Sequence, residues 1–424
     1  MGKRIVITAF GSFGDVNPCV GLALGLKQRG HSPVIATAEF YRSYVQSEGI
    51  GFHPVRPDVD PRDEEVMRRV MDPKRGTEYL FKEFLFPRVR ESYKDLSEVV
   101  RGAELLLSHP VTFAGPLVAE KEKVPWASTV LAPISFFSAH DLPAFPPFPW
   151  LAALRRFGPV VGRPLVGLVK RSTRRWAEPI RRLRADLGLP PGKDPVYEGQ
   201  FSPRLVLAMF SRVLAQPKPD WPPNVRITGQ IFYDGSSASS NLQPGLARFL
   251  RSGPAPVVFT LGTSAVEAAG SFYRESLSAA RRLGVRAVLL VGKNPKNHPP
   301  RPLPEGVAAF DYAPFSALLP QAAAVVHQGG IGTMGQALRS GRPMLVVPFA
   351  HDQPDNALRA EGLGVARLVY PRRYSARRVA EHLRVLLENP RYRIRASEVA
   401  MQVRSEDGVG AACEAIEELL ARTR

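Results

Sequence analysis

Residues 323–356 hold the glycines and polar side chains whose spacing best suits ligand binding. A glycine-rich turn at 328–333 follows a short apolar run, and its glycines allow the backbone to approach a ligand closely. Because a helix is predicted after the turn, free N–H groups and the helix dipole would attract an anion such as a diphosphate. Asp352 and Gln353 follow the next apolar run, and a carboxylate and an amide suit the recognition of hydroxyl groups.

Three consecutive segments, HQGGIGT, GRPMLVVPF and HDQPDNA, together resemble the donor-binding signature of family 1 glycosyltransferases, which are inverting enzymes with the GT-B architecture. The resemblance is to the bacterial branch, which acts on lipophilic acceptors. It implies transfer of a hexose from a nucleotide sugar, with UDP-glucose expected, and it implies no metal and no resident cofactor. The implied acceptor is an apolar molecule with a hydroxyl, such as a sterol, a polyketide, a flavonoid or a lipid-like compound.

The resemblance assigns donor-binding roles to individual residues. Asp352 and Gln353 would bind the sugar hydroxyls, and Thr263 and Ser264 would face the diphosphate from a second small-residue turn. The other donor-binding candidates are Tyr312, Ala313, His327, Gln328, Gly329, Gly330, Gly332, Thr333 and Gln336.

Two of these candidates depart from the family pattern. Gln328 stands where relatives usually have a phosphate-binding His, and His327 precedes it. Gln336 stands at the position of an acidic residue that binds the ribose. An amide donates hydrogen bonds but carries no charge, so the substitutions predict weaker stabilisation of the leaving group and a weaker ribose contact.

Asp15 and His109 are the candidate catalytic residues. Inverting transfer needs a base that takes the acceptor hydroxyl proton as the oxygen attacks the anomeric carbon. Asp15 follows the first predicted strand, at the sheet edge where α/β proteins bind ligands, and the resemblance implies that it replaces the family's usual His. The alternative is that Asp15 only caps a helix predicted from Pro18. His109 ends another strand at this edge and could polarise Asp15, but lone histidines are more often structural.

The segment 136–150 is rich in aromatics and prolines and cannot continue a helix or a central strand. It predicts a stiff apolar loop that forms a lid or a wall of the acceptor site, or a loop that only packs on the core. The acceptor-binding candidates are Phe136, His140, Phe145 and Trp150.

The elements that must position these residues alternate between strand and helix, which predicts an α/β protein with two Rossmann-like, doubly wound domains facing a cleft. The strand at 205–209 is expected to be the last of the first domain, and 348–356 is expected to be a loop. The expected parts are an acceptor-binding domain at 1–232, a linker at 233–245, a nucleotide-sugar-binding domain at 246–398 and a C-terminal helix at 399–424 that crosses back to the first domain.

Composition excludes several classes of protein. The 424 residues are 44% apolar and 23% charged, which is typical of a globular protein, and no apolar run is long enough to span a membrane. The net charge of +18 permits an anionic partner, but the sequence contains no recognised nucleic-acid-binding motif. The two cysteines form no disulfide scaffold, and the short apolar run near the N-terminus does not predict a signal peptide. The expected location is therefore the cytoplasm.

The segment from Arg155 to Asp186 has ten Lys or Arg residues against two acidic ones, a local net charge of +8. Apolar residues lie between the charges, and basic amphipathic helices bind anionic membrane surfaces. This pattern predicts peripheral membrane contact, although apolar residues packed on the domain and solvated arginines would explain it equally well.

Two other functions are compatible with the same fold. A catalytically silent helper would bind the nucleotide sugar or a partner enzyme without transferring the sugar. A GT-B epimerase would need paired carboxylates, and the sequence shows no such pair.

Overall fold

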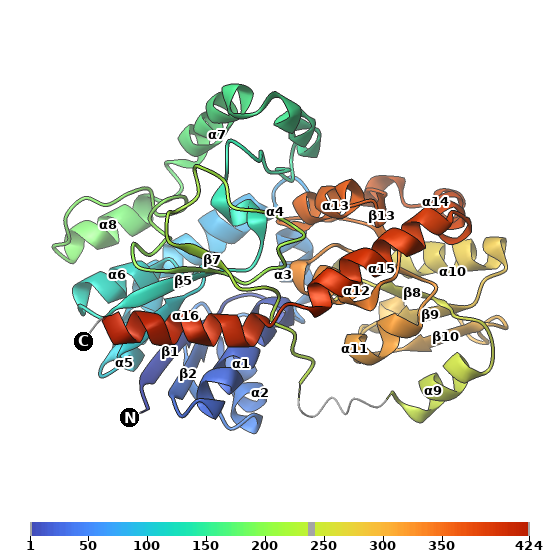
Figure 1. The fold of residues 1–424 in the computed structure, drawn as a ribbon, viewed down its shortest axis with the longest axis horizontal. Coiled ribbons are helices and arrows are strands. Elements are labelled where there is room, and N and C mark those ends of the chain that lie inside the picture. The colour runs from blue at the N-terminus through green and yellow to red at the C-terminus, as the bar shows by residue number, and fades with distance from the viewer. Residues whose placement is uncertain (1, 236–241, 423–424) are drawn as a thin grey trace.

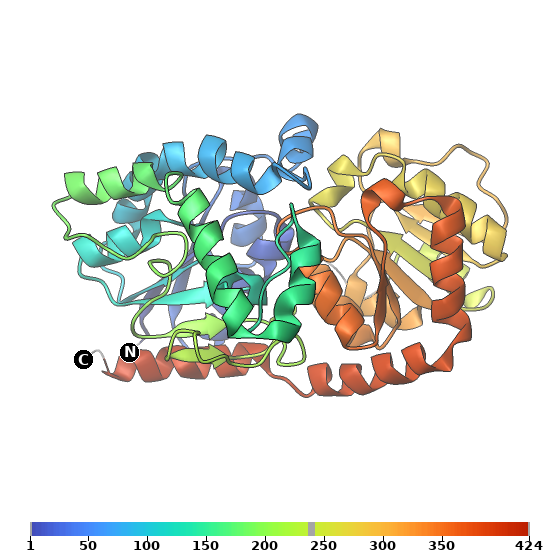
Figure 2. The same cartoon turned by 90° about the horizontal axis from the view of Figure 1, so that it is seen from above.

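The structure is a computed structural model that describes residues 2–235 and 242–422. Figures 1 and 2 show two α/β domains side by side, the first in blue to green and the second in yellow to red. Each domain has one parallel sheet with helices on both faces, so the predicted pair of doubly wound domains is confirmed. Of the predicted linker at 233–245, residues 236–241 lie outside the described part of the chain.

The N-terminal sheet has seven parallel strands in the order β3-β2-β1-β4-β5-β6-β7. The prediction that 205–209 holds the last strand of this domain is wrong, because a short seventh strand pairs with the sixth. The strands are β1 (Arg4–Thr8), β2 (Ser32–Thr37), β3 (Gly51–Pro54), β4 (Leu105–Ser108), β5 (Trp126–Val130), β6 (Val206–Ala208) and β7 (Val225–Ile227).

The helices of this domain cover both faces of the sheet. They are α1 (Phe13–Gln28), α2 (Arg42–Ser47), α3 (Glu64–Val70), α4 (Gly76–Tyr79), α5 (Val89–Val100), α6 (Ala114–Lys121), α7 (Pro159–Thr173) and α8 (Glu178–Asp186), with 3-10 turns η4 (Pro133–Phe136) and η5 (Pro149–Phe157).

Helix α1 begins at Phe13, earlier than the expected start at Pro18. Ser12 is its N-cap, and the Ser12 hydroxyl and the Asp15 carboxylate form a capping box that satisfies free backbone N–H groups. Pro18 therefore lies inside the helix, where it removes one backbone hydrogen bond without ending the helix.

The C-terminal sheet has six parallel strands in the order β10-β9-β8-β11-β12-β13. The strands are β8 (Val257–Thr260), β9 (Ala287–Leu290), β10 (Val307–Phe310), β11 (Ala324–His327), β12 (Met344–Val346) and β13 (Ala366–Leu368). The helices are α9 (Pro244–Arg251), α10 (Phe272–Leu283), α11 (Phe315–Leu318), α12 (Ile331–Ser340), α13 (Gln353–Gly362), α14 (Ala376–Glu388), α15 (Pro390–Arg404) and α16 (Gly408–Arg422).

The glycine turn follows β11 and leads into α12, as the sequence predicted. The loop expected at 348–356 is shorter than predicted, because α13 begins at Gln353 with Asp352 at its N-cap position. The turn and α13 follow neighbouring parallel strands, so both helix N-termini open toward the same edge of the sheet.

The chain returns to the N-terminal domain at its end. Helix α15 packs on α12, whereas α16 packs on α1 of the other domain, and Figure 2 shows the two helices running along one side of both domains. Arg29, the C-cap of α1, donates a 2.7 Å hydrogen bond to Glu417 on α16, which ties this end of the chain to the first domain. No described helix combines the length and the apolar composition that a membrane span requires.

Candidate active site

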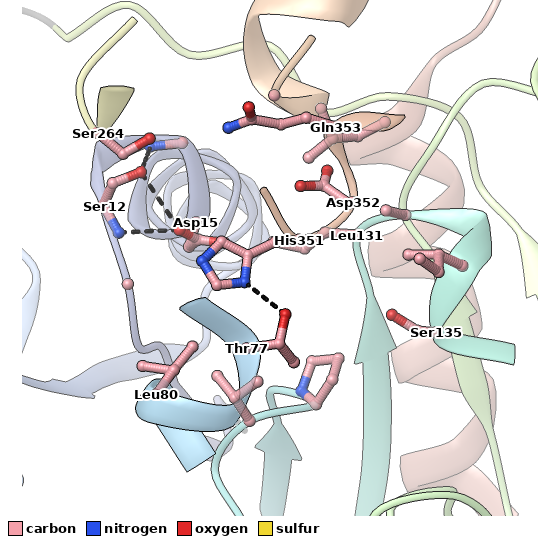
Figure 3. Close-up of a pocket in the computed structure, with 18 of the residues that line it drawn as sticks. Ser12, Asp15, Thr77, Leu80, Leu131, Ser135, Ser264, His351, Asp352 and Gln353 are labelled. Carbon is pink, nitrogen blue, oxygen red and sulfur yellow. Dashed lines mark hydrogen bonds between the residues drawn. The ribbon is translucent and has the colours of Figure 1, made fainter. Parts of the chain in front are cut away.

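A cavity of about 720 Å³ lies between the two domains and is lined by residues of both. Its polar end is formed by the N-termini of α1 and α12, which approach each other so closely that a Cβ added to Gly332 would lie 3.6 Å from the Cα of Gly14. The other end is apolar and is lined mainly by side chains of the N-terminal domain. Figure 3 shows Asp15, His351 and Asp352 pointing into the cavity from the two sides.

Asp15 is fixed at the polar end by the first turn of α1. Its Oδ2 accepts a 2.8 Å hydrogen bond from the backbone N–H of Ser12, so the alternative role in helix capping is real (Figure 3). The capping box occupies only this oxygen, and the side chain keeps 34% of its surface exposed within the cavity. Burial, and then repulsion from Asp352, raises the pKa of Asp15 to about 7. A carboxylate with this pKa accepts a proton readily near neutral pH.

His109 is the second titratable side chain beside Asp15. It lies 5% exposed after β4, with its Nε2 atom 4.0 Å from Oδ1 of Asp15, which is too far for a hydrogen bond. Burial lowers the pKa of His109 to about 4, so the ring is neutral at pH 7. The sequence placed these two residues at one edge of the sheet, and the structure brings them together there.

Asp352 faces Asp15 from the opposite domain. Burial raises the pKa of Asp352 to about 6, and its Oδ2 accepts a 2.7 Å hydrogen bond from the amide of Asn356. The sequence shows no paired carboxylates, but the cleft brings Asp15 and Asp352 close enough for their charges to repel. The pairing was missed because the two residues lie on different domains.

Gln353 also lines the cavity, but its amide is already partly engaged. Its Oε1 accepts a 2.8 Å hydrogen bond from the backbone N–H of Phe349. The Oε1 also lies 3.4 Å from the backbone N–H of Ala350, so the amide nitrogen is the group left to donate to a hydroxyl oxygen of a ligand. Asn356, the sixth residue of the HDQPDNA segment, donates a 3.0 Å hydrogen bond to the carbonyl of Gly329 and ties α13 to the glycine turn.

Gly330, Gly332 and Thr333 line the cavity at the N-terminus of α12, where the first backbone N–H groups of a helix have no partner within the helix. Gly329 does not line the cavity; its φ of +87° reverses the chain after β11. His327 is fully buried, and its Nδ1 accepts a 3.1 Å hydrogen bond from the N–H of Gly329. The expectation that His327 binds the donor directly is therefore wrong, because the last residue of a buried strand points into the core and here supports the turn.

Gln328 and Gln336 both line the cavity beside the turn. The Nε2 of Gln328 lies 3.4 Å from the hydroxyl of Thr333, and its buried Oε1 has no hydrogen-bond partner within the described chain. Gln336 donates a 2.8 Å hydrogen bond to Asp234, a residue of the connection between the domains. Asp234 also lines the cavity, and its carboxylate therefore lies close to the ribose position that the resemblance assigned to Gln336.

Thr263 and Ser264 line the cavity from the turn after β8, as expected. Tyr312 and Ala313 do not line it. Tyr312 is 52% exposed, with its hydroxyl 3.4 Å from the carbonyl of Asp234, and Ala313 is buried in the core. Phe315, at the start of α11, lines the cavity instead.

The apolar end is built mostly from residues that the sequence did not identify. Phe145 is the one acceptor-binding candidate that lines it. Other large side chains around this end are Met67, Met71, Phe81, Phe84, Phe113, Leu131, Phe137, Phe148, Leu151, Val169, Trp176 and Tyr197. Met67 comes from α3, Phe81 and Phe84 come from the helical turn Leu80–Leu85 that follows α4, and Val169 comes from α7. Their contribution depends on packing that the sequence does not reveal.

Three acceptor-binding candidates lie elsewhere, so those expectations are wrong. Phe136 stacks on Trp221 in the core with ring centroids 4.1 Å apart. The next residue, Phe137, has a left-handed backbone with φ of +47°. Its side chain therefore points to the side opposite Phe136 and lines the cavity. His140 and Trp150 are outside the cavity lining, and Trp150 is 68% exposed to solvent.

His351 was missed as a site residue although it begins the HDQPDNA segment. Its backbone is left-handed with φ of +56°, and its Nδ1 lies 3.3 Å from the hydroxyl of Thr77 on α4 (Figure 3). Burial lowers the pKa of His351 to about 4, so the ring is neutral at pH 7. The contact joins the two domains across the cavity.

Known proteins with similar sequences were compared with this chain. The glycosyltransferase family 28 N-terminal domain matches residues 5–131, and the erythromycin biosynthesis protein CIII-like C-terminal domain matches residues 277–419. The O-mycaminosyltylonolide 6-deoxyallosyltransferase of Streptomyces fradiae is 32% identical over 98% of this chain and 97% of its own length. The chain belongs to the family 1 glycosyltransferases. The resemblance predicted from the sequence is thereby confirmed.

Other relatives of this glycosyltransferase differ more in length or sequence. A sterol 3-beta-glucosyltransferase of Emericella nidulans is 30% identical over 97% of the chain, which spans only 30% of that relative. Solved structures share the GT-B fold: the glycotransferase of kitacinnamycin has a TM-score of 0.73 at 20% identity, covering 99% of this chain and all of that one. The glycosyltransferase VinC in complex with dTDP has a TM-score of 0.66 at 20% identity, covering 99% of this chain and all of VinC.

Proposed function

We propose that this glycosyltransferase moves a hexose, with inversion, from a nucleotide sugar to a hydroxyl of an apolar acceptor. The observation that carries the proposal is the position of Asp15. Its carboxylate lies where the polar, glycine-lined end of the cavity meets the apolar end, with one oxygen held by Ser12 and a third of the side chain exposed. A base at such a junction can reach an acceptor hydroxyl and leaves the opposite face of the sugar for the leaving group.

The transfer requires one bond to form as another breaks. Asp15 takes the hydroxyl proton, the acceptor oxygen bonds to the anomeric carbon, and the bond from that carbon to the diphosphate oxygen breaks. The departing diphosphate keeps the bonding electron pair, and backbone N–H groups at the N-terminus of α12 stabilise its charge. Thr263 and Thr333 line the cavity around this position and supply hydroxyl donors.

Asp352 and Gln353 are proposed to orient the sugar from the first turn of α13. UDP-glucose is the first donor to test, because the relative from Emericella nidulans is named a sterol 3-beta-glucosyltransferase. The rival is a 6-deoxyhexose donor, because the relative from Streptomyces fradiae is named a 6-deoxyallosyltransferase. We propose that the nucleotide sugar is the co-substrate and that neither a metal nor a resident cofactor takes part.

The experiment starts with donor binding. Thermal shift with UDP, dTDP, UDP-glucose and a dTDP-6-deoxyhexose should identify the nucleotide and the sugar. Mass spectrometry with a panel of sterols, macrolides and flavonoids should then detect a hexose adduct. Donor binding with no transfer to any acceptor and no hydrolysis of the donor would instead identify the catalytically silent helper.

The location is proposed to be cytoplasmic with contact to an anionic membrane. Phe157, Val160 and Leu168 are exposed on η5 and α7, whereas Val166 on the same helix packs inward against the proline-rich loop. The outward apolar side chains lie among Arg171, Arg174, Arg175 and other exposed cations. Val169 and Trp176 line the apolar end of the cavity, so this surface adjoins the part of the cavity where an apolar acceptor is proposed to bind.

A further inference from the structure

Four charged side chains cluster between the domains. None of them lines the cavity, but residues close to them in the sequence do. Asp141 lies in the proline-rich loop at 136–150 of the N-terminal domain, and Arg155 follows it on η5. Asp355 and Arg359 lie on α13, which Figure 1 labels. Asp355 is fully buried and the Arg359 side chain is 7% exposed. Charges this deep are costly unless they are paired and hydrogen-bonded, so their arrangement needs a reason.

The cluster is satisfied through contacts between the domains. Arg359 donates a 2.7 Å hydrogen bond to Asp355 on its own helix and another of 2.7 Å to Asp141 on the other domain. Arg155 lies 3.4 Å from Asp141 and also donates to Asp355. The Oδ1 of Asp355, which accepts from Arg155, also accepts a 3.0 Å hydrogen bond from the backbone N–H of Ala144. We call these four residues the interdomain ion network.

The network joins two parts of the active site. On one side, Asp355 is two residues after Gln353, which lines the polar end of the cavity. On the other side, the loop held by Ala144 and Arg155 carries Phe145 and Leu151, which line the apolar end. We call α13 the donor helix and the loop that carries Phe145 and Leu151 the acceptor wall. Displacing one partner of the network would therefore move one or the other.

We infer that the interdomain ion network positions the acceptor wall against the donor helix, so that donor binding orders the loop before the acceptor is held. The inference rests on the proposed function, because it takes the ligand of the polar end to be a nucleotide. A nucleoside diphosphate at the glycine turn would restrict the motion of Gly329. The hydrogen bond from Asn356 to Gly329 would then restrict α13, and the bonds of Asp355 to Ala144 and Arg155 would restrict the loop. A fully satisfied polar network is rigid and can transmit such a change.

The experiment uses two adjacent arginines of the full-length chain. Arg155→Ala removes the charged contact of the loop with Asp355, so that only the backbone hydrogen bond from Ala144 remains, and it leaves the pair of Asp355 and Arg359 intact within α13. Arg156→Ala is the matched control, because Arg156 is exposed and stacks on Phe157 at 4.7 Å outside the network. Arg155→Lys keeps the charge but not the forked geometry, so it should restore part of the function.

Hydrogen–deuterium exchange of residues 141–157 is the readout, with and without UDP and dTDP. In the parent protein and in Arg156→Ala, the nucleotide should slow exchange in this segment. In Arg155→Ala, the segment should exchange roughly tenfold faster or more, since a charged hydrogen bond is lost, and should no longer respond to nucleotide. Arg155→Lys should be intermediate.

Two outcomes would overturn the inference. One is a segment in Arg155→Ala that exchanges and responds as in the parent protein; the other is faster exchange throughout the chain, which would make Arg155 a residue of general stability. Failure of the proposed function would give a different result, because neither nucleotide would then slow exchange in residues 329–336 of any variant. The comparison of Arg155→Ala with the parent protein in the absence of nucleotide would still test the network.

Discussion

Asp15 serves the fold and the proposed chemistry with different oxygens. Its Oδ2 closes the capping box with Ser12, and its Oδ1 faces His109 at 4.0 Å. Because Asn can retain the capping hydrogen bond but cannot accept a proton, Asp15→Asn separates the two roles. It should lower kcat by about 10²–10⁴-fold and leave donor affinity nearly unchanged. Steady-state kinetics and donor titration measure this, and near-normal turnover in the folded variant would reject Asp15 as the base.

The pKa of Asp15 also makes stability depend on pH. The folded value of about 7 lies above the ordinary value of 3.8, so between these pH values the folded state binds more protons than the unfolded state. Stability is therefore lost as pH rises from about 4 through 7. Asp15→Asn should melt at a higher temperature than the parent protein at pH 8, and the difference should disappear near pH 4.

Calorimetry across that pH range measures the difference, with exposed Glu122→Gln as the control that should follow the parent protein. A constant difference between Asp15→Asn and the parent protein at every pH would contradict the raised pKa.

Asp352 is predicted to contact the sugar and not the nucleotide. Asp352→Ala should weaken binding of the accepted nucleotide sugar by roughly 10–100-fold, because a hydrogen bond to a charged group is lost. Binding of the free nucleoside diphosphate should change little, since the diphosphate is proposed to bind at the N-terminus of α12, whereas Asp352 precedes α13 and is proposed to bind the sugar. Isothermal titration with both ligands tests this, and equal losses would show that the α13 turn has another role.

At the scale of elements, the turn between β11 and α12 depends on glycine for two reasons. Gly329 has φ of +87°, and a Cβ there would lie 2.8 Å from Val346 and 3.2 Å from the carbonyl oxygen of Gln353. Gly284 has φ of +62° but nothing within 4 Å of an added Cβ, so a substitution there would introduce backbone strain without a steric clash.

Gly284→Ala should therefore cost about 1–2 kcal/mol in the free energy of unfolding, whereas Gly329→Ala adds overpacking of about 1–3 kcal/mol. Urea denaturation of both variants measures the difference. Similar losses in the two variants would mean that the turn can move away from β12 without cost.

At the scale of the whole molecule, the basic surface of η5 and α7 is predicted to bind anionic lipid. Each cation near such a surface contributes about 1 kcal/mol. Anionic liposomes should therefore sediment more protein than neutral liposomes at low salt, and high salt should reduce the difference. Replacing Arg171, Arg174 and Arg175 together by Glu should abolish it; sedimentation that is equal for both lipids, or unchanged in this variant, would identify an ordinary solvated face.

The sequence by itself determined the two α/β domains, the glycine turn and its helix, and the family. These features are local: a strand of apolar residues, a turn that needs glycine and a helix stop at Gly341 follow from neighbouring residues. The edge of the sheet that would hold Asp15 and His109 also followed from the order of the elements, because parallel strands end on one side.

Only the tertiary structure decided which side chains face the cavity and how they titrate. The left-handed backbone of Phe137 places its side chain, and not that of Phe136, in the cavity lining. The composition of the segment does not reveal this change of backbone conformation. Asp141 and Arg359 are 218 residues apart in sequence, yet they share a hydrogen bond across the domains. The raised pKa of Asp15 has the same origin, because the burial and the opposing carboxylate that cause it exist only when both domains close over the cleft.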